Sequence, residues 1–112
     1  MDTNNCIFCK IASGEIKTDF VYQTEEVVAF KDLNPQAPTH ILVIPKKHYP
    51  TLNEVDDAQL LSKLMLGVQE TVKKLGITEY RTVINTGKQA GQEVFHIHLH
   101  ILAGRQMLWP PG

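Results

Sequence analysis

The chain lacks the features that mark membrane-embedded, secreted or nucleic-acid-binding proteins. No apolar run is long enough to span a membrane, and the first residues do not form a basic region followed by an apolar one, as in a secretion signal. The formal net charge is −1 without a basic stripe, which argues against nucleic acid and anionic membranes as partners. We therefore expect a cytoplasmic protein. Its two cysteines should then be reduced or bound to a metal.

Nothing in the sequence divides the chain into parts. It has no internal repeat, no low-complexity tract and no linker, and its 112 residues suffice for one core between two layers. A hydrophobic fraction of 43% and a charged fraction of 21% are ordinary for a globular protein. These observations predict a single domain over residues 1–112.

Local patterns predict an α+β domain with one short helix, one long helix and five strands. Phe8 and Ile11 stand three residues apart before Gly14, which favours a short helix. Apolar residues recur at helical spacing over 56–75, and Gly76 follows as a stop, so this is the long helix. We expect the helices on one side of a mostly antiparallel sheet. The β-rich runs that predict its strands are 20–22, 27–30, 40–45, 80–85 and 95–102.

Three of the five histidines stand on alternate positions, with aliphatic residues between them: His96, His98 and His100. Alternation with period two puts the imidazoles on one face of a strand and the aliphatic residues on the other face, towards a core. Three interpretations stay open. The row could be the polar face of an ordinary strand, two rings could share a metal ion, or His98 could be a nucleophile.

Spacing weighs against one metal ion bound to all three rings, and charge favours the nucleophile. At about 3.3 Å per residue, the Cα atoms of His96 and His100 lie about 13 Å apart, too far for one ion to bind all three rings easily. Crowded imidazoles depress one another's pKa, so at least one ring stays neutral and keeps a free lone pair. A neutral imidazole is a nucleophile, and the central ring is the best placed.

The histidine row resembles the signature of the histidine-triad (HIT) family, His-φ-His-φ-His-φ-φ with φ aliphatic. Residues 30–40 resemble the family's upstream nucleotide-site segment, and residues 104–112 are similar to the tail of its Hint branch, the nucleoside phosphoramidate hydrolases. The resemblance covers nearly the whole chain. It implies a HIT-like α+β fold and a homodimer whose sheet continues across the interface. The tail, 104–112, would lie at the active site or the dimer surface, where Trp109 would pack against the neighbouring subunit.

The resemblance implies hydrolysis of a purine nucleoside phosphoramidate in two steps at the α-phosphorus. His98 would attack and form a covalent nucleotidyl-histidine, which water then cleaves. His100 would donate a hydrogen bond to a non-bridging or leaving-group atom. His40 would support the triad from outside, although a satisfied strand histidine is an equal alternative. With His96, the first of the triad, these residues form the catalytic set.

Two other functions remain open beside the phosphoramidase. One is a dinucleotide polyphosphate hydrolase of the Fhit type, in which a nucleotide would be the leaving group. The other is a nucleotide-binding regulatory or scaffold protein. The tail sequence Trp109-Pro110-Pro111 favours the phosphoramidase over the first, and the intact pair His98 and His100 argues against the second.

A nucleotide site is also implied by the resemblance. Asp32 would accept from the ribose hydroxyls, although aspartate also caps turns, and apolar residues would enclose the base, although each could be plain core. The loop 87–92 would cradle the phosphate, although it could be an ordinary connection. Glu93 replaces a serine of some family members, and we expect it to point away because a carboxylate repels phosphate. The implied nucleotide-binding residues are Phe8, Ile11, Phe30, Asp32, Leu33, Asn85, Gly91, Gln92, His98 and His100.

The pair Cys6-x-x-Cys9 supplies half of a tetrahedral zinc site. By itself it could also be a redox pair or two small apolar residues. The resemblance implies structural zinc, as in a subset of HIT proteins, with the pair joined by His48 and His96.

Overall fold

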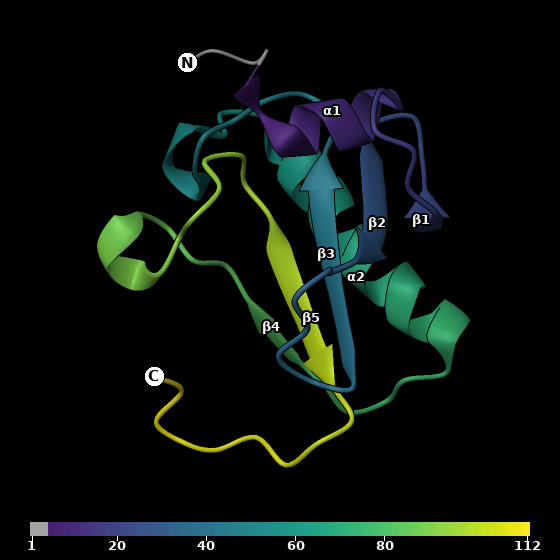
Figure 1. Cartoon of the computed structure of the whole chain (residues 1–112), viewed down its shortest axis with the longest axis vertical. Helices are drawn as coiled ribbons and strands as arrows, with labels where there is room; N and C mark the ends of the chain where they lie inside the picture. Colours follow the sequence, from purple (N-terminus) through teal and green to yellow (C-terminus); the bar gives the residue numbers. More distant parts are fainter. Residues whose placement is uncertain (1–4) are drawn as a thin grey trace.

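The computed structural model describes residues 5–112 (Figure 1). No helix in this part of the chain is long and apolar enough to cross a membrane. The elements in chain order are α1 (Ile7–Ser13), β1 (Phe20–Gln23), β2 (Val27–Lys31), β3 (Thr39–Pro45), the 3-10 helix η2 (Leu52–Glu54), α2 (Ala58–Leu75), β4 (Arg81–Val83), the 3-10 helix η3 (Lys88–Ala90) and β5 (Leu99–Ala103).

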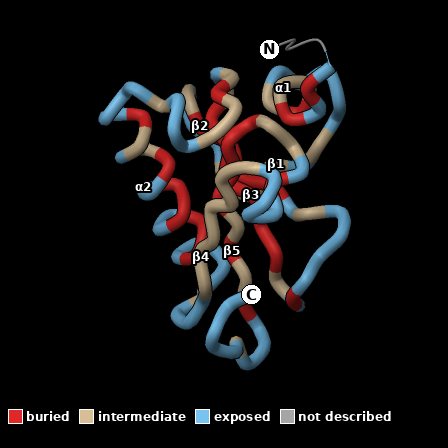
Figure 2. Tube along the Cα trace, turned by 90° about the vertical axis from the view of Figure 1, so that its left-hand side faces the viewer, coloured by how far each residue is buried: buried red, intermediate tan, exposed pale blue. Residues whose placement is uncertain are grey.

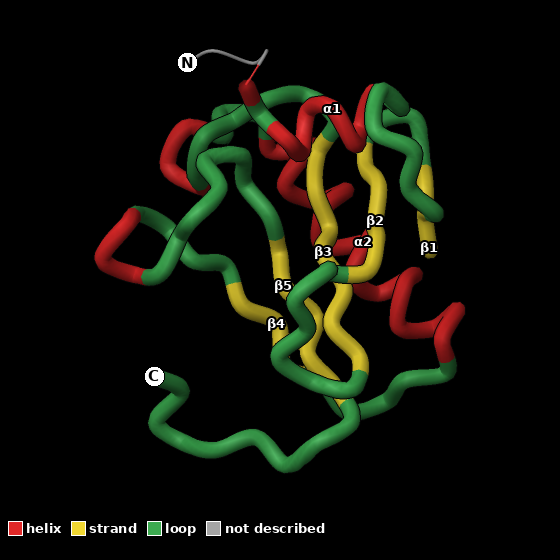
Figure 3. The backbone as a smooth tube through the Cα atoms, in the orientation of Figure 1, coloured by secondary structure: helices red, strands yellow, loops and turns green. Residues whose placement is uncertain are grey.

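The five strands form one antiparallel sheet in the order β1-β2-β3-β5-β4, which confirms the predicted fold class (Figure 3). In the β3–β5 ladder, Thr39 pairs with Ala103 and Val43 pairs with Leu99. The segment that leads into β3 therefore lies beside the end of β5, and the segment that leads into β5 lies near the end of β3. These two segments carry most of the polar residues of the site.

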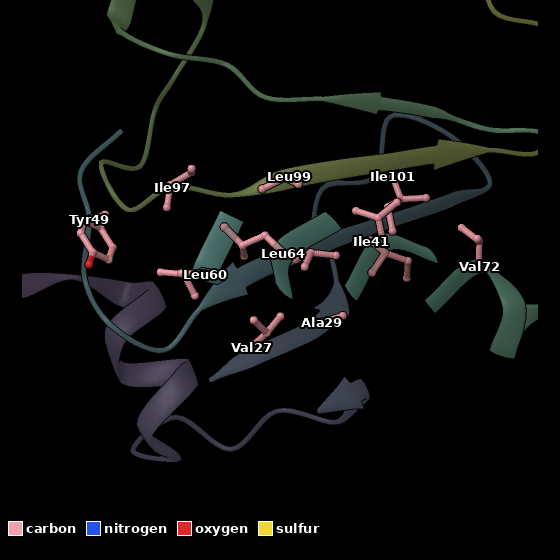
Figure 4. Packing of buried hydrophobic residues seen from close by; sticks show 12 residues of the cluster. Val27, Ala29, Ile41, Tyr49, Leu60, Leu64, Val72, Ile97, Leu99 and Ile101 are labelled. Atoms are coloured by element: carbon pink, nitrogen blue, oxygen red, sulfur yellow. The ribbon is translucent and has the colours of Figure 1, made fainter. Parts of the chain in front are cut away.

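The helices pack on opposite faces of the sheet, which corrects the expectation that they lie on one side. Alternate residues of β2 and β3 belong to two separate cores, because successive side chains of a strand point to opposite faces. Both central strands are therefore buried on both faces (Figure 2). The core under α2 contains Val27, Ala29, Ile41, Val43, Leu60, Leu64, Val68 and Val72 (Figure 4), and the core under α1 contains Phe8, Ile11, Val28, Phe30, Leu42 and Ile44.

The last strand begins at Leu99 and not at residue 95 as predicted. The facing strand β3 ends at Pro45, which has no N–H for a longer ladder. The Pro45 carbonyl oxygen instead accepts from Nε2 of His96 at 2.7 Å, and Ile97 N–H donates to the carbonyl oxygen of Tyr49 at 2.7 Å. The predicted alternation nevertheless holds. Ile97, Leu99 and Ile101 belong to the core under α2, and the three histidines lie on the α1 face.

The tail after β5 forms no helix or strand and runs along the surface (Figure 3). Arg81 donates to the carbonyl oxygen of Leu108 at 2.9 Å, which ties the tail to β4. Trp109 is nonetheless 83% exposed, so this chain provides it with almost no packing partner.

Candidate functional site

A pocket of about 500 Å³ opens on the α1 face of the sheet. This volume suits a small ligand. A larger hollow of about 700 Å³, between residues 77–81 and 103–107, contains none of the histidines. The smaller pocket brings together every predicted nucleotide-binding residue except Gln92: Phe8, Ile11, Phe30, Asp32, Leu33, Asn85, Gly91, His98 and His100.

His98 keeps one ring nitrogen free. Its Nδ1 lies 2.8 Å from the carbonyl oxygen of His96, and a carbonyl can only accept, so Nδ1 carries the proton. Burial lowers the pKa of His98, outweighing the opposing effect of this hydrogen bond. The ring is therefore neutral near pH 7, with the lone pair on Nε2. Phe8 packs edge-on against the ring at 5.1 Å between centroids and fixes its plane.

A chain of hydrogen bonds orients His100. Gln36 N–H donates to Nδ1 of His40 at 3.0 Å, so the proton of neutral His40 is on Nε2. That nitrogen lies 2.8 Å from Nδ1 of His100 and 3.4 Å from Oδ2 of Asp32. His100 therefore accepts at Nδ1 and carries its proton on Nε2, which is buried without a partner in the part of the chain described. His40 is thus a strand histidine that hydrogen-bonds to the third histidine of the triad.

Electrostatics keep His100 in its neutral form. Burial, together with the neighbouring rings of His98 and His40, lowers the pKa of His100 to about 4. An N–H donor without charge therefore lies at the pocket. The structure offers an acceptor nitrogen on His98 and a donor nitrogen on His100, with the ring centroids 5.0 Å apart.

Asp32, His40 and His100 lie close enough to resemble a metal site, because their ligand atoms fall within 4.8 Å of one another. The hydrogen bonds argue against a metal there. A histidine that binds a metal donates its other N–H to an acceptor, whereas Nδ1 of His40 already accepts from Gln36. The Nε2 proton of His40 occupies the position that a metal would need.

The other cluster, Cys6, Cys9, His48 and His96, could hold a metal ion. His96 Nδ1 lies 3.3 Å from Cys6 Sγ and 3.5 Å from Cys9 Sγ, and His48 Nδ1 lies 3.2 Å from Cys9 Sγ. Tetrahedral zinc with nitrogen and sulfur ligands needs separations of about 3.3–3.8 Å. His96 also donates from Nε2 to the Pro45 carbonyl, as a metal ligand should. The donor set therefore fits the ion.

Without a cation, His96 and Cys9 of this cluster are uncharged near pH 7. Burial lowers the pKa of His96 to about 4. Burial, together with the hydrogen bond and the charge of Cys6, raises the pKa of Cys9 to about 11. A metal would replace thiol protons here, because the thiolate is the form that binds.

The apolar wall of the pocket comes from α1 and β2. Phe8 and Phe30 meet edge to face at 5.7 Å between centroids, and both are buried. Leu33 is 96% exposed although it lines the pocket, so it is not the plain core residue of the alternative interpretation. Asp32 both lines the pocket and caps a turn, since its Oδ1 accepts from Asn34 N–H at 2.8 Å.

Two residues of the loop before β5 differ from expectation. Gln92 is buried and does not line the pocket, because its side chain bonds to Gly87 N–H and to the carbonyl oxygens of Pro50 and Val94. It holds the loop, and this arrangement offers no phosphate contact from it. Glu93, expected to point elsewhere, is among the residues that line the pocket.

A family model of the HIT domain matches residues 13–107. The chain belongs to the HIT family. It is 52% identical to protein HitA of Neisseria gonorrhoeae over 102 residues, covering 88% of this chain and 95% of that protein. Among solved structures, it is similar to a HIT family hydrolase from Legionella pneumophila, with TM-score 0.91, 50% identity and coverage of 96% of this chain and 100% of that one. A histidine triad nucleotide-binding protein from Candida albicans gives TM-score 0.83 and 32% identity, with coverage of 95% and 83%.

Sequence reasoning missed two groups that organise this HIT domain. They are the N–H of Gln36, which sets the proton of His40, and the carbonyl of Pro45, which sets the proton of His96. Both groups belong to the backbone, so no residue type signals them. Only the antiparallel pairing that places residue 45 beside residue 96 could have indicated the second.

The hydrogen bonds of the HIT domain predict one tautomer for each histidine. Long-range ¹H–¹⁵N spectra should show Nδ1–H for His98 and Nε2–H for His40, His96 and His100. Because the pKa of His100 lies near 4, its ring signals should stay constant between pH 7.5 and 5.5. An Nε2–H tautomer at His98 would contradict the assignment of its lone pair.

Proposed function

We propose that this HIT protein hydrolyses purine nucleoside phosphoramidates, such as adenosine 5′-monophosphate (AMP) joined to an amine. The observation that carries the proposal is the hydrogen bond from His98 Nδ1 to the His96 carbonyl oxygen, which leaves the Nε2 lone pair in a pocket residue. The names of the similar Legionella hydrolase and Candida nucleotide-binding protein support a hydrolase that acts on nucleotides.

The reaction proceeds in two displacements at the α-phosphorus. The Nε2 lone pair of His98 forms a bond to phosphorus while the phosphorus–nitrogen bond of the substrate breaks, and the leaving amine takes a proton from solvent. Water then forms a bond to phosphorus and loses a proton to solvent, while the phosphorus–Nε2 bond breaks. This releases the nucleotide and restores neutral His98. In both steps His100 Nε2–H donates a hydrogen bond to a non-bridging oxygen and stabilises its charge.

The nucleoside binds along the apolar wall. Phe8, Ile11, Phe30 and Leu33 enclose the base, and exposed Leu33 gains an apolar contact by doing so. Asp32 accepts from the ribose hydroxyls with the lone pairs that its turn leaves free. Gly91, at φ 96°, adopts a backbone conformation that side chains disfavour and lets the chain approach the phosphate beside Asn85.

The two other candidate functions receive less support from the site. A dinucleotide polyphosphate carries several negative charges, yet no lysine or arginine lines the pocket in the described part of the chain. A scaffold that only binds nucleotides does not need a histidine with a directed free lone pair.

We propose that Cys6, Cys9, His48 and His96 hold structural zinc, which places the chain in the zinc-binding subset of the Hint branch. The ion would join α1 to the segment before β5 and so stabilise the wall behind His98. Its ligands leave His98 and His100 outside the cluster.

We also propose that the protein is a homodimer. β4 is an edge strand with three residues, and an edge favours pairing with a second copy. Trp109 and Leu108 are exposed in the single chain, and packing on the partner would remove their apolar surface from water.

Rapid mixing with an adenosine phosphoramidate should add one adenylyl group to the protein, as measured by intact mass. His98→Asn should abolish the adduct and the turnover, and should change AMP affinity by less than about tenfold, because a nucleophile acts on the reaction barrier. His40→Asn removes the hydrogen bond that orients His100 but keeps the nucleophile, so it should slow the formation of the adduct without abolishing it. Full turnover by His98→Asn would refute the mechanism, and AMP binding without turnover by the wild type would favour the scaffold.

Protein purified without chelator should contain one zinc per chain by elemental analysis. Cys9→Ser and His48→Asn should lose the metal and lower Tm by about 5 °C or more, since ligation contributes folding free energy. His40→Asn should keep the metal, because His40 belongs to the other cluster. Wild-type protein free of stoichiometric metal would refute the site.

Light scattering at micromolar concentration should give twice the chain mass of 12.6 kDa. Trp109 is the only tryptophan, so its fluorescence reports on the tail alone. Emission at shorter wavelength than that of tryptophan in water is expected in the dimer. A monomeric mass, or the emission of a fully hydrated indole, would contradict the proposed packing.

A further inference from the structure

Two acidic residues, Asp32 and Glu93, line the pocket, and no lysine or arginine lines it among the described residues. Glu93 is exposed, so its carboxylate is accessible to a ligand. A negative charge added to a bound nucleotide therefore meets no cationic side chain here.

Asp32 and Glu93 belong to segments at opposite ends of the β3–β5 ladder. Asp32 precedes β3, and its Oδ2 lies 3.4 Å from His40 Nε2, near the pair Thr39–Ala103. Glu93 precedes β5, which begins beside the last residues of β3. In Figure 1 the connection from β2 to β3 lies at the lower end of β3, and the segment before β5 lies at its upper end. His98 directly precedes Leu99, the first residue of β5, so it belongs to the same end of the ladder as Glu93.

Glu93 has a fixed backbone and an unpaired side chain. The neighbouring Gln92 donates from Nε2 to the carbonyl oxygens of Val94 at 3.0 Å and Pro50 at 2.7 Å. Its Oε1 accepts from Gly87 N–H at 2.8 Å. These bonds hold the chain on both sides of Glu93, whereas its own carboxylate makes no hydrogen bond or ion pair with the residues that the structure describes. The side chain is exposed, so its charge is solvated by water and stays free to meet a ligand in the pocket.

We propose that Glu93 selects the leaving group by charge, favouring a cationic amine over a neutral one and both over an anionic one. This rests on the proposed function. A nucleotide with its ribose at Asp32 and its phosphorus at His98 directs its leaving group to the end of the pocket that Glu93 lines. A cationic leaving group there is attracted by the Glu93 carboxylate, and an anionic leaving group is repelled by it. The substrate class is then a purine nucleotide joined through nitrogen to an amine that bears a second, protonated amino group.

The test uses three adenosine phosphoramidates whose amines have matched length and differ only at the far end. The amines are 1,3-diaminopropane, butylamine and 3-aminopropanoate, which end in an ammonium, a methyl and a carboxylate group. For the wild type, kcat/KM should fall in that order. Glu93→Gln should reduce the ratio between the first and the third by about tenfold, as expected for a charge pair at a partly hydrated site.

Two controls separate a local effect from a general one. Glu70→Gln removes the same charge from α2 on the other face of the sheet, where Glu70 lies 3.8 Å from Lys73, and should leave the ratio unchanged. Added KCl should lower the wild-type ratio of kcat/KM between the ammonium and the carboxylate compound, because salt screens exposed charges. AMP, a dianion, should bind Glu93→Gln about threefold or more tighter than the wild type, a result that needs no turnover.

The outcomes distinguish this inference from the function on which it rests. If the wild type cleaves none of the three compounds, the proposed function fails. If it cleaves all three and Glu93→Gln keeps both the wild-type ratio and the wild-type AMP affinity, the function stands and charge selection by Glu93 is wrong. An equal reduction of the kcat/KM ratio in Glu70→Gln would also overturn charge selection by Glu93, because the effect would then follow from the net charge of the protein.

Discussion

Every histidine of the triad has one ring nitrogen committed to a fixed partner, and this constraint decides what the other nitrogen can do. His96 donates from Nε2 to the Pro45 carbonyl, which leaves Nδ1 beside two thiols. His98 donates from Nδ1 to the His96 carbonyl, which leaves Nε2 for the pocket. His100 accepts at Nδ1 from His40, which leaves a donor on Nε2. The same residue type thus supplies a nitrogen that could bind a metal, a free lone pair and a hydrogen-bond donor.

The β3–β5 ladder makes these commitments possible. Its pairing ends at Val43 and Leu99. Beyond that end, the Pro45 carbonyl accepts from the His96 ring, and the Ile97 N–H donates to the Tyr49 carbonyl. Because β3 is buried on both faces, the core under α2 holds Ile97 and Leu99 in place while the histidines face α1. The core under α2 therefore positions the histidine rings. Cys6 and Cys9, which belong to the α1 segment, contact His96 on the α1 face of the sheet.

The sequence predicts the elements whose patterns are local. The alternation over residues 96–101 correctly separates the histidines from the aliphatic residues, and helical spacing correctly predicts α2. It does not place the helices, because the continuous apolar run of β3 is compatible with cover on either face or both. The predicted start of β5 at residue 95 was wrong. Residues before Leu99 have no ladder partner on β3, and this depends on the register between two strands that are distant in the sequence.

The residues of the site also divide into those that a local pattern predicts and those whose position depends on distant contacts. Residues recognised from the triad and from the segment 30–40 line one pocket, including exposed Leu33. Gln92 differs because its partner Pro50 lies 42 residues away, and no local pattern encodes that contact. Glu93 shows that repulsion by phosphate alone does not predict where a side chain lies, since the backbone on both sides is held by Gln92.

The proposed mechanism requires that His98 Nε2, and not water, attacks phosphorus first. The most direct measurement is the stereochemical course of hydrolysis. One diastereomer of an adenosine thiophosphoramidate would be hydrolysed in ¹⁸O-labelled water, and the configuration of the product read by ³¹P NMR. Each in-line displacement inverts phosphorus, so attack by His98 followed by water predicts overall retention. Overall inversion would show a single attack by water and would contradict the account.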